Sequence, residues 1–334
     1  MGGSGGVGPA DCRRTQGGMV MAFEIRQARR EQVPVMVGLM GPSGSGKTYS
    51  ALRLATGIQS VSGGEICVID TESRRALHYA DDFRFLHMQF DAPFGPGRYL
   101  EAIKAAYDAG ARTIVVDSMS HEHEGPGGVL EMHERELQRM GGQDRHNFPA
   151  WAKPKAERRA MINGILQIPA NFIFCFRAKD KTKPGTDASG KKSLIEQGCM
   201  PIAGEEFVFE MTANCLLLPG AAGVPVWRSD YPGERAMMKR PRMFERTLAD
   251  GRQLSEQVGA ELALWARGQL PDDEDRLSKL EARGREAAEM GKEAKARFWK
   301  SLSAADQVAL TERAKRPAPA IVDEMGETLI GEGE

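Results

Sequence analysis

Apolar runs and amphipathic segments alternate along the chain between residues 33 and 219. The apolar runs have the length of strands and lie at 33–40 (VPVMVGLM), 65–70 (EICVID), 112–118 (RTIVVDS), 171–176 (NFIFCF) and 213–219 (ANCLLLP). The segments with helical spacing lie at 48–59, 98–110 and 155–167. Continuous apolar runs are typical of strands buried on both faces. The alternation therefore predicts a doubly wound α/β fold, with a mostly parallel sheet that helices cover on both sides.

Both ends of the chain differ in amino-acid composition from this α/β region. The first residues, MGGSGGVGPADCRRTQGG, are rich in glycine and nearly free of apolar side chains, so burial cannot offset the entropy cost of ordering them. The last part of the chain is charged, helix-forming and finally Pro-containing. We therefore predict a flexible leader over 1–20, an α/β domain over 21–268, and a helical, partly disordered tail over 269–334.

Composition narrows the class of protein without indicating a chemistry. Hydrophobic residues make up 41% and charged residues 27%, which are normal values for a soluble globular protein. The 45 Lys and Arg nearly balance the 46 Asp and Glu, which excludes a histone-like polycation. No apolar run approaches the roughly 18 residues of a membrane span, and no signal-peptide core is visible. The five cysteines form no CxxC pair, so we expect reduced thiols in a cytoplasmic protein, with Met1, Met19 or Met21 as its start.

One motif carries a specific chemistry: residues 41–48, GPSGSGKT, match the full pattern GxxxxGK[ST]. Its glycines allow successive backbone N–H groups to form an anion-binding nest, and the helix that follows directs its positive end at bound phosphate. Lys47 is expected to reach the β- and γ-phosphates, and Thr48 to bind Mg²⁺. The predicted site for ATP and Mg²⁺ comprises Gly41, Pro42, Ser43, Gly44, Ser45, Gly46, Lys47, Thr48 and Tyr49.

Acidic residues follow two of the apolar strands, where they can complete such a site. Asp117 comes after RTIVV and is expected to hold Mg²⁺ through water, unless it is a helix N-cap. Asp70 and Glu72 come at the end of EICVID and just beyond it. From that position, the Glu72 carboxylate can orient and deprotonate a water molecule beside the γ-phosphate. The alternative for Glu72 is a capping or surface residue.

The order of GPSGSGKT, VIDTESRRALHYAD and IVVDSMS resembles the ATPase core of the RecA-like recombinases over about residues 33–220. The chain is also similar to the short AAA-type ATP-binding proteins of phages and prophages, some of which act in single-strand annealing and recombination. The resemblance implies a P-loop fold of RecA-like topology. It assigns the catalytic base to Glu72 and the magnesium acid to Asp117, and Lys47 joins Glu72 as a catalytic residue.

The same resemblance implies Mg²⁺-dependent ATP hydrolysis coupled to single-stranded DNA binding in phage-type recombination. It also implies a homo-oligomer in the bacterial cytoplasm, encoded by a phage or prophage. A phage recombination protein is expected to dock on the C-terminal helix that carries Phe298 and Trp299. The sequence departs from the recombinases after NFIFCF, where RAKDKTK replaces a Gln-containing sensor, and it lacks their additional domains. Complete strand invasion is therefore not expected.

The segment His121-Glu122-His123-Glu124 follows the strand that ends at Asp117. Because it leaves the carboxyl end of a parallel strand, we expect it to lie beside the γ-phosphate as a switch-like loop. Glu122 or Glu124 is then the second choice for the catalytic base. A zinc site using His121 and His123 is the less favoured alternative.

Positive charge is concentrated between residues 141 and 192, where eleven Lys and Arg face four Asp and Glu. This balance of +7 would attract a nucleic-acid backbone, and Phe148 and Trp151 could stack on unpaired bases. A solvated face with a mobile loop is an equally good interpretation. The candidates for sensing phosphate or binding DNA are Arg177, Lys179, Lys181 and Lys183.

Two further interpretations concern basic segments after residue 180. Residues 181–192, KTKPGTDASGKK, have the composition of a disordered excursion. A second basic cluster could act as a finger on the site of a neighbouring subunit; it comprises Lys239, Arg240, Arg242 and Arg246.

Two other classes of function remain open. A small-molecule kinase also uses a P-loop, and residues 177–192 are basic enough to form its lid. A nucleotide-gated adaptor would bind ATP without useful turnover. A GTPase is disfavoured because the sequence contains no NKxD segment.

Overall fold

The computed structural model describes residues 33–186, 192–268, 271–302, 307 and 310–311; the predicted leader, 1–20, lies outside this range. The strands are β1 (Met36–Gly41), β2 (Glu65–Asp70), β3 (Leu86–Gln89), β4 (Ala111–Asp117), β5 (Asn171–Thr186), β6 (Lys192–Pro201) and β7 (Ala213–Leu216). The α-helices are α1 (Lys47–Ser62), α2 (Pro96–Asp108), α3 (Ser120–Glu124), α4 (Val129–Arg139), α5 (Asn147–Ala150), α6 (Ala152–Leu166), α7 (Glu205–Phe209), α8 (Pro232–Met237), α9 (Glu256–Ala266), α10 (Pro271–Glu289) and α11 (Lys292–Ser301). The 3₁₀ helices are η1 (Arg75–Tyr79), η2 (Asp144–His146) and η3 (Arg242–Phe244).

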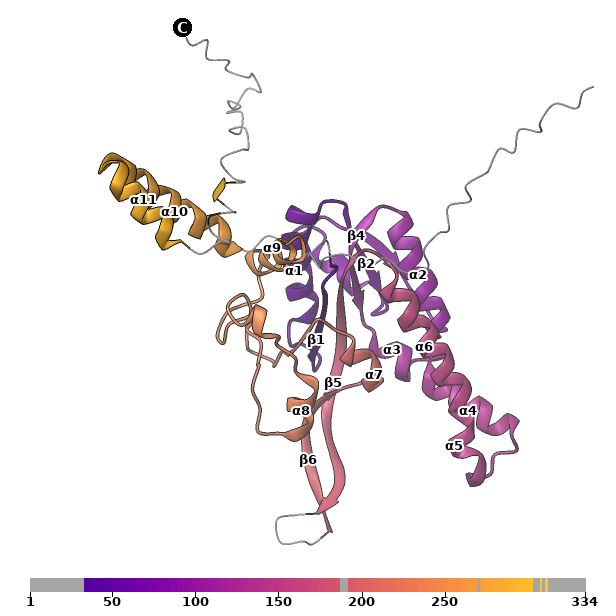
Figure 1. Cartoon of the computed structure of the whole chain (residues 1–334). Helices are drawn as coiled ribbons and strands as arrows, with labels where there is room; N and C mark the ends of the chain where they lie inside the picture. Colours follow the sequence, from indigo (N-terminus) through magenta and orange to yellow (C-terminus); the bar gives the residue numbers. More distant parts are fainter. Residues whose placement is uncertain (1–32, 187–191, 269–270, 303–306, 308–309, 312–334) are drawn as a thin grey trace, which may run out of the picture.

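The sheet has the order β3-β2-β4-β5-β1-β7, and all five of these pairings are parallel (Figure 1). This arrangement confirms the predicted doubly wound α/β fold. Each of the five apolar runs forms a strand at its expected place. The short strand β3 was not expected, because its sequence LHMQ alternates in polarity and is only partly buried at the edge of the sheet.

Two apolar layers hold the sheet between helices. On one face α2 and α6 pack over β5 through Phe172, Phe174 and Phe176; on the other, α1 and α9 pack over Ile173 and Cys175 (Figure 1). Successive residues of β5 thus serve opposite layers, as the period of two in a strand requires. Each fully buried side chain of this size contributes about 1.5–3 kcal/mol to stability. The double burial explains why every position from Phe172 to Phe176 is apolar.

β5 continues far beyond the sheet and corrects one expectation. From Ala178 to Thr186 it pairs antiparallel with β6, so residues 181–186 and 192 belong to a two-stranded hairpin and not to a disordered excursion. Hydrogen bonding to β6 orders this segment, and the composition of the segment does not show that β6 pairs with it. Residues 187–191, at the turn, lie outside the described part of the chain.

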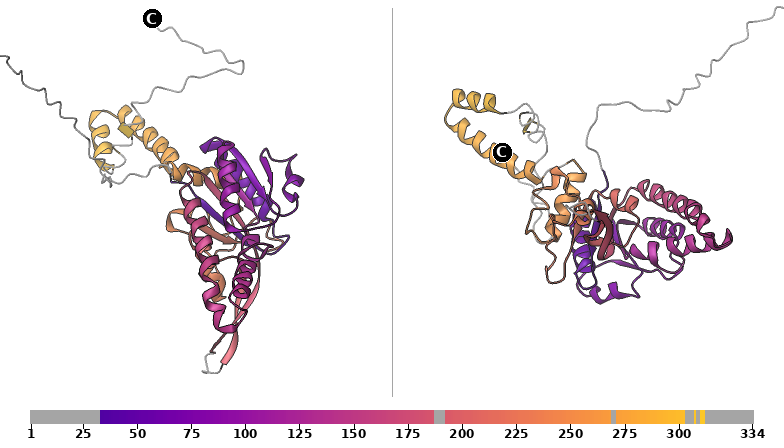
Figure 2. Two further views of the ribbon diagram at one scale, coloured as in Figure 1. Left: turned by 90° about the vertical axis from the view of Figure 1, so that its right-hand side faces the viewer. Right: turned by 90° about the horizontal axis from the view of Figure 1, so that it is seen from below.

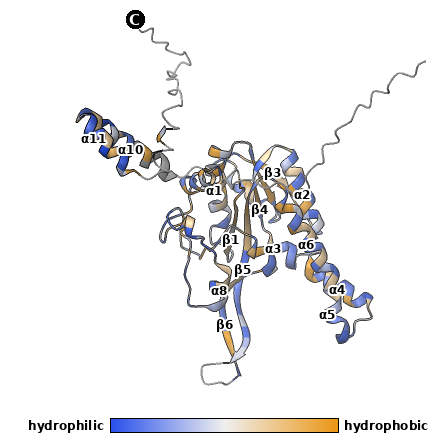
Figure 3. Cartoon of the chain, in the orientation of Figure 1, coloured by the Kyte–Doolittle hydropathy of each residue, from blue (hydrophilic) through white to orange (hydrophobic). Residues whose placement is uncertain are grey.

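A second projection, formed by α4, α5 and the first turns of α6, leaves the domain on the same side as the hairpin and diverges from it (Figures 1 and 2). Both projections extend from the edge at which the parallel strands end. Hydrophilic residues predominate on α4, α5 and the outer part of β5 (Figure 3). We call the segment from Val129 to Arg159 the helical arm.

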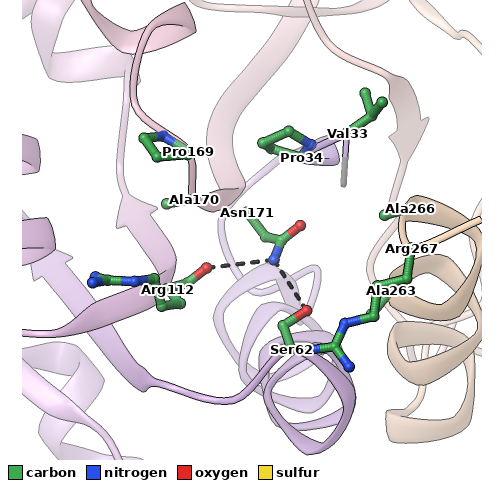
Figure 4. A pocket seen from close by; sticks show the side chains of 10 residues that line it. All are labelled: Val33, Pro34, Ser62, Arg112, Pro169, Ala170, Asn171, Ala263, Ala266 and Arg267. Carbon is green, nitrogen blue, oxygen red and sulfur yellow. Dashed lines mark hydrogen bonds between the residues drawn. The ribbon is translucent and has the colours of Figure 1, made fainter. Parts of the chain in front are cut away.

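Asn171 ties the opposite edge of the sheet together (Figure 4). Its Oδ1 accepts a hydrogen bond from the backbone N–H of Val35 at 3.1 Å. Its Nδ2 donates to Ser62 Oγ and to the carbonyl oxygen of Arg112, both at 3.4 Å. A cavity of about 110 Å³ lies beside it. Because both polar atoms of Asn171 are satisfied within the protein, we assign this cluster a structural role.

The region predicted as a tail contains α10 and α11, which a break at Gly291 (φ 109°) separates. The two helices pack on each other where Phe298 lies against Gly284. Trp299 is 42% exposed. None of the helices in the described part of the chain is long and apolar enough to cross a membrane.

The close crossing of α1 and α9 generates a test of this packing. A Cβ at Gly57 would overlap the backbone oxygen of Glu256, so Gly57→Ala forces the helices apart. We expect a loss of about 1–3 kcal/mol in the free energy of unfolding, measured by urea denaturation. In the control Gly97→Ala, no described atom lies within 4 Å of the added Cβ, so stability should be unchanged or slightly higher. Equal stability of the two variants would contradict the close crossing.

Candidate nucleotide-binding site

The loop between β1 and α1 has the backbone that an anion nest requires. Gly44 and Gly46 adopt positive φ values of 77° and 81°, a region that favours glycine. At Gly41 a side chain would overlap the carbonyl oxygen of Leu217. Lys47 Nζ donates to the carbonyl oxygens of Gly41 at 3.0 Å and Pro42 at 2.8 Å. The ammonium group is therefore held over the loop whose N–H groups would surround phosphate.

Thr48 and Asp117 meet although 69 residues separate them. Thr48 Oγ1 donates to Asp117 Oδ2 at 2.5 Å. Burial raises the pKa of Asp117 to about 6, and the hydrogen bond from Thr48 opposes that rise. A buried carboxylate beside a hydroxyl is stabilised by a hard cation, and oxygen donors are the ligands that Mg²⁺ prefers. The two side chains therefore fit the predicted magnesium site.

Glu72 lies at the same edge, in the loop that follows β2. Asp70 shapes this loop, because its carboxylate accepts hydrogen bonds from the backbone N–H groups of Glu72 at 2.8 Å and Ala76 at 3.0 Å. The Glu72 side chain is 17% exposed and lies 3.4 Å from Arg75 Nη1 and 3.7 Å from Arg177 Nε. Asp70 is thus a scaffold for the loop, and Glu72 faces the pocket.

A pocket of about 190 Å³ brings the predicted groups together. Its walls include seven residues that the sequence named for the phosphate loop, the magnesium site and the base: Ser43, Gly44, Gly46, Lys47, Thr48, Glu72 and Asp117. Arg177 also lines it, as expected of a phosphate sensor, because β5 lies between β1 and β4. The walls also include side chains that sequence reasoning missed: Arg75, His78 and Tyr79. Their only signal was their place directly after the strand that ends at Asp70.

Tyr49 lies beside this pocket and not within it. Its ring packs against Tyr79 and Phe83, with centroids 5.8 and 5.3 Å apart. It lines a neighbouring pocket of about 430 Å³ that shares Gly44 and Gly46 with the first. The phosphate loop is thus open on two sides.

His121 connects Arg177 to the loop after β2. Its Nδ1 lies 2.8 Å from Thr71 Oγ1, and its Nε2 lies 3.3 Å from Arg177 Nη1. Burial lowers the pKa of His121, which agrees with a neutral ring that accepts from the guanidinium and donates to the threonine. Both ring nitrogens are therefore engaged.

This arrangement leaves little support for the zinc alternative. His123 Nδ1 lies 2.9 Å from Arg158 Nη2, and burial lowers the pKa of His123 to about 4. Within the described ranges, no cluster of three or more His, Cys, Asp or Glu side chains is placed to hold a metal ion.

The second-choice bases lie outside the pocket. Glu122 is 3% exposed and accepts two hydrogen bonds from Arg158, at 3.0 and 2.9 Å. Burial raises the pKa of Glu122, and the Arg158 charge opposes that rise. Glu124 faces Lys179 at 3.7 Å. Glu72 lines the pocket, and Glu122 and Glu124 do not.

The remaining cations of the sequence analysis lie away from the phosphate loop. Lys179, Lys181 and Lys183 are on the β5–β6 hairpin. In the second basic cluster, Lys239 Nζ donates to the carbonyl oxygens of Phe209 and Met211, and Arg240 pairs with Asp250 at 2.6 Å. Neither group lines the pocket of its own chain.

The parallel sheet, the phosphate loop and the Thr48–Asp117 pair define a P-loop nucleotide-binding protein. Residues 33–202, which are 170 of the 334 in the chain, match the family model described as an AAA domain. The chain therefore belongs to the AAA domain family. No curated protein matches the chain.

The buried pair of Glu122 and Arg158 generates a stability prediction. Arg158→Leu leaves the Glu122 carboxylate buried without a partner, so we expect a loss of about 3–5 kcal/mol in the free energy of unfolding. The double variant Glu122→Leu/Arg158→Leu should recover most of this loss. The neighbouring Arg159 is exposed, so Arg159→Leu should change stability by less than about 0.5 kcal/mol. Urea denaturation of the three variants measures these differences, and a fully stable Arg158→Leu would contradict the pairing.

Proposed function

We propose that this protein hydrolyses ATP with Mg²⁺ and couples hydrolysis to single-stranded DNA binding in phage-type recombination or annealing. One observation carries the hydrolytic part: Glu72, Lys47 and Asp117 share one pocket although they follow three different strands. The DNA part is supported by the resemblance to phage recombination ATPases and by the basic hairpin that continues from the pocket. The bacterial cytoplasm remains the expected location.

The residues of the pocket have different roles in the proposed hydrolysis. The loop N–H groups and Lys47 hold the phosphates, while Thr48 and, through water, Asp117 hold Mg²⁺, which would neutralise the charge that develops on the phosphates. Glu72 orients a water molecule and accepts its proton. Its contacts with Arg75 and Arg177 keep the carboxylate near the pocket.

Arg177 is the candidate for the cation that senses the γ-phosphate, because it lines the same wall as Glu72. The basic cluster of residues 239–246 lies outside the pocket of its own chain, and it would act on the site of a neighbouring subunit in a homo-oligomer. A phage recombination protein bound at α11 is part of the same proposal, with Trp299 as the exposed ring.

The other two classes of function receive less support. Among the described residues of the possible kinase lid, Lys179, Lys181, Lys183 and Lys192 belong to a two-stranded hairpin, and Arg177 lines the pocket. A nucleotide-gated adaptor would not need Glu72 at the pocket. Activity measurements distinguish all three.

The hydrolytic proposal predicts separate effects for binding and turnover. Glu72→Gln should keep ATP binding and lower kcat by at least about 100-fold, because the general base is lost. Lys47→Ala should lose both binding and turnover. Phosphate release and binding of a fluorescent ATP analogue, measured side by side, test this.

Two further variants sharpen that test. Glu101→Gln changes an exposed carboxylate on α2 outside the pocket and should leave kcat unchanged. Glu124→Gln tests the alternative base. If Glu124→Gln abolishes turnover while Glu72→Gln retains it, the assignment of the base is wrong. If the unmodified protein binds ATP without measurable turnover, the hydrolytic proposal is wrong and the adaptor takes its place.

The DNA proposal predicts that single-stranded DNA stimulates hydrolysis through the hairpin. Exchange of Lys179, Lys181 and Lys183 for alanine should weaken DNA binding and remove stimulation, while hydrolysis without DNA is retained. A control variant exchanges Lys104, an exposed cation on α2. Hydrolysis that is indifferent to DNA in the unmodified protein would contradict the coupling.

A further inference from the structure

The end of the helical arm carries an unusual group of aromatic side chains. Phe148, on α5, is 83% exposed, more than any other large hydrophobic side chain in the described part of the chain. Close by, the rings of Trp151 and His133 stack, with centroids 4.1 Å apart and an interplanar angle of 18°. Single exposed apolar side chains are common on protein surfaces, but an exposed ring close to a stacked aromatic pair marks a candidate binding surface.

The stacked pair is fixed in place by the fold of the arm. His133 lies on α4, and its Nε2 donates to the carbonyl oxygen of Asn147 at 2.9 Å. This bond joins α4 to the start of α5 and sets the orientation of the imidazole under the Trp151 ring. Contacts within the arm therefore hold the stacked Trp151–His133 pair in one orientation, which lowers the entropy cost of binding a partner there.

Lys155 adds a positive charge beside the exposed Phe148 ring and the half-buried Trp151 ring. Its Nζ lies 6.0 Å from the centroid of Phe148 and 5.9 Å from that of Trp151. Among the described residues, no carboxylate lies within ion-pair distance of Lys155. By contrast, Glu136 already pairs with Arg139 at 2.8 Å and with Lys153 at 3.2 Å. Lys155 thus keeps its charge available for an anion next to the rings.

Rings beside an available cation match the chemistry of unpaired nucleotides, which offer a flat base and a phosphate in each unit. Duplex DNA does not fit, because its bases are already stacked inside the helix. An apolar protein partner would leave the Lys155 charge buried and unpaired, which is costly. The arm and the basic hairpin leave the domain on the same side and diverge from each other, so a strand long enough to cross between them could contact both (Figures 1 and 2).

We propose that Phe148, Trp151 and Lys155 form a stacking surface for single-stranded nucleic acid at the end of the helical arm. The rings of Phe148 and Trp151 take unpaired bases, and Lys155 binds a neighbouring phosphate. This inference deepens the proposed function, since it rests on single-stranded DNA as the partner. It adds a binding surface that is separate from both the ATP pocket and the hairpin lysines.

The test is fluorescence anisotropy of the full chain with labelled oligo-dT at several salt concentrations. Phe148→Ala should weaken binding about tenfold, because one base loses its stacking partner. Lys155→Ala should lower the slope of log K against log salt by about 0.7, the contribution of one phosphate on a single strand. Tyr231→Ala, another exposed ring, and Lys104→Ala are the matched controls and should retain both affinity and slope.

The outcomes separate this surface from the proposed function. If the unmodified chain binds oligo-dT and both arm variants bind it with unchanged affinity and slope, the arm surface is wrong while the DNA proposal stands. If the unmodified chain does not bind oligo-dT, both fail, and hydrolysis of ATP is judged by the Glu72 and Lys47 variants alone. Tighter binding of duplex than of oligo-dT would overturn the stacking surface. Unchanged oligo-dT binding with altered self-association of Phe148→Ala would assign Phe148 to a protein contact instead.

Discussion

The parallel hydrogen bonding of β2, β4, β5 and β1 is the constraint on which the site depends. In the register of this sheet, Asp70 lies beside Asp117, Asp117 beside Cys175, and Gly41 beside Arg177. The ends of the four strands therefore form one row at one edge. Residues that are far apart in the chain meet there because the backbone pairing leaves them no other position. The two apolar layers, one on each face, hold that row in place.

The charges in this row explain why the pocket is poised for phosphate and a cation. Asp117 and Glu72 bring negative charge to the pocket, and Lys47 and Arg177 bring positive charge to it. Burial destabilises the charged form of Asp117, and a bound cation would relieve that cost. The Asp70 carboxylate accepts hydrogen bonds from backbone N–H groups of the loop after β2, so it stabilises that loop and is not free to bind a ligand. Adjacent carboxylates thus have different roles because their neighbours differ.

Local sequence predicted the features that depend on local chemistry. The P-loop was visible because its glycine spacing reflects the backbone conformation that binds phosphate. The strands were visible because continuous apolar runs reflect burial on both faces of the sheet. The roles of Glu122 and the hairpin were not visible. Glu122 is committed to Arg158, 36 residues away, and residues 181–186 are ordered by pairing with β6. The role of a polar side chain depends on which distant residues it contacts. A single sequence does not show which of several carboxylates lies near which cation.

β5 gives the molecule a direct connection between its chemistry and its projections. Its first half is buried on both faces, Arg177 reaches the pocket, and the next residues enter the hairpin without a break in the strand. The same strand thus carries Arg177 at the pocket and the lysines of the hairpin only a few residues further on, although its pairing with β6 shifts register between Lys181 and Thr182. The neighbouring lysines of the hairpin are only loosely paired with acids, at 3.7 Å for Lys179 and for Lys183, and are therefore free to exchange partners at little cost. The rigid part of the strand thus serves the nucleotide, and its exposed part is suited to a charged partner.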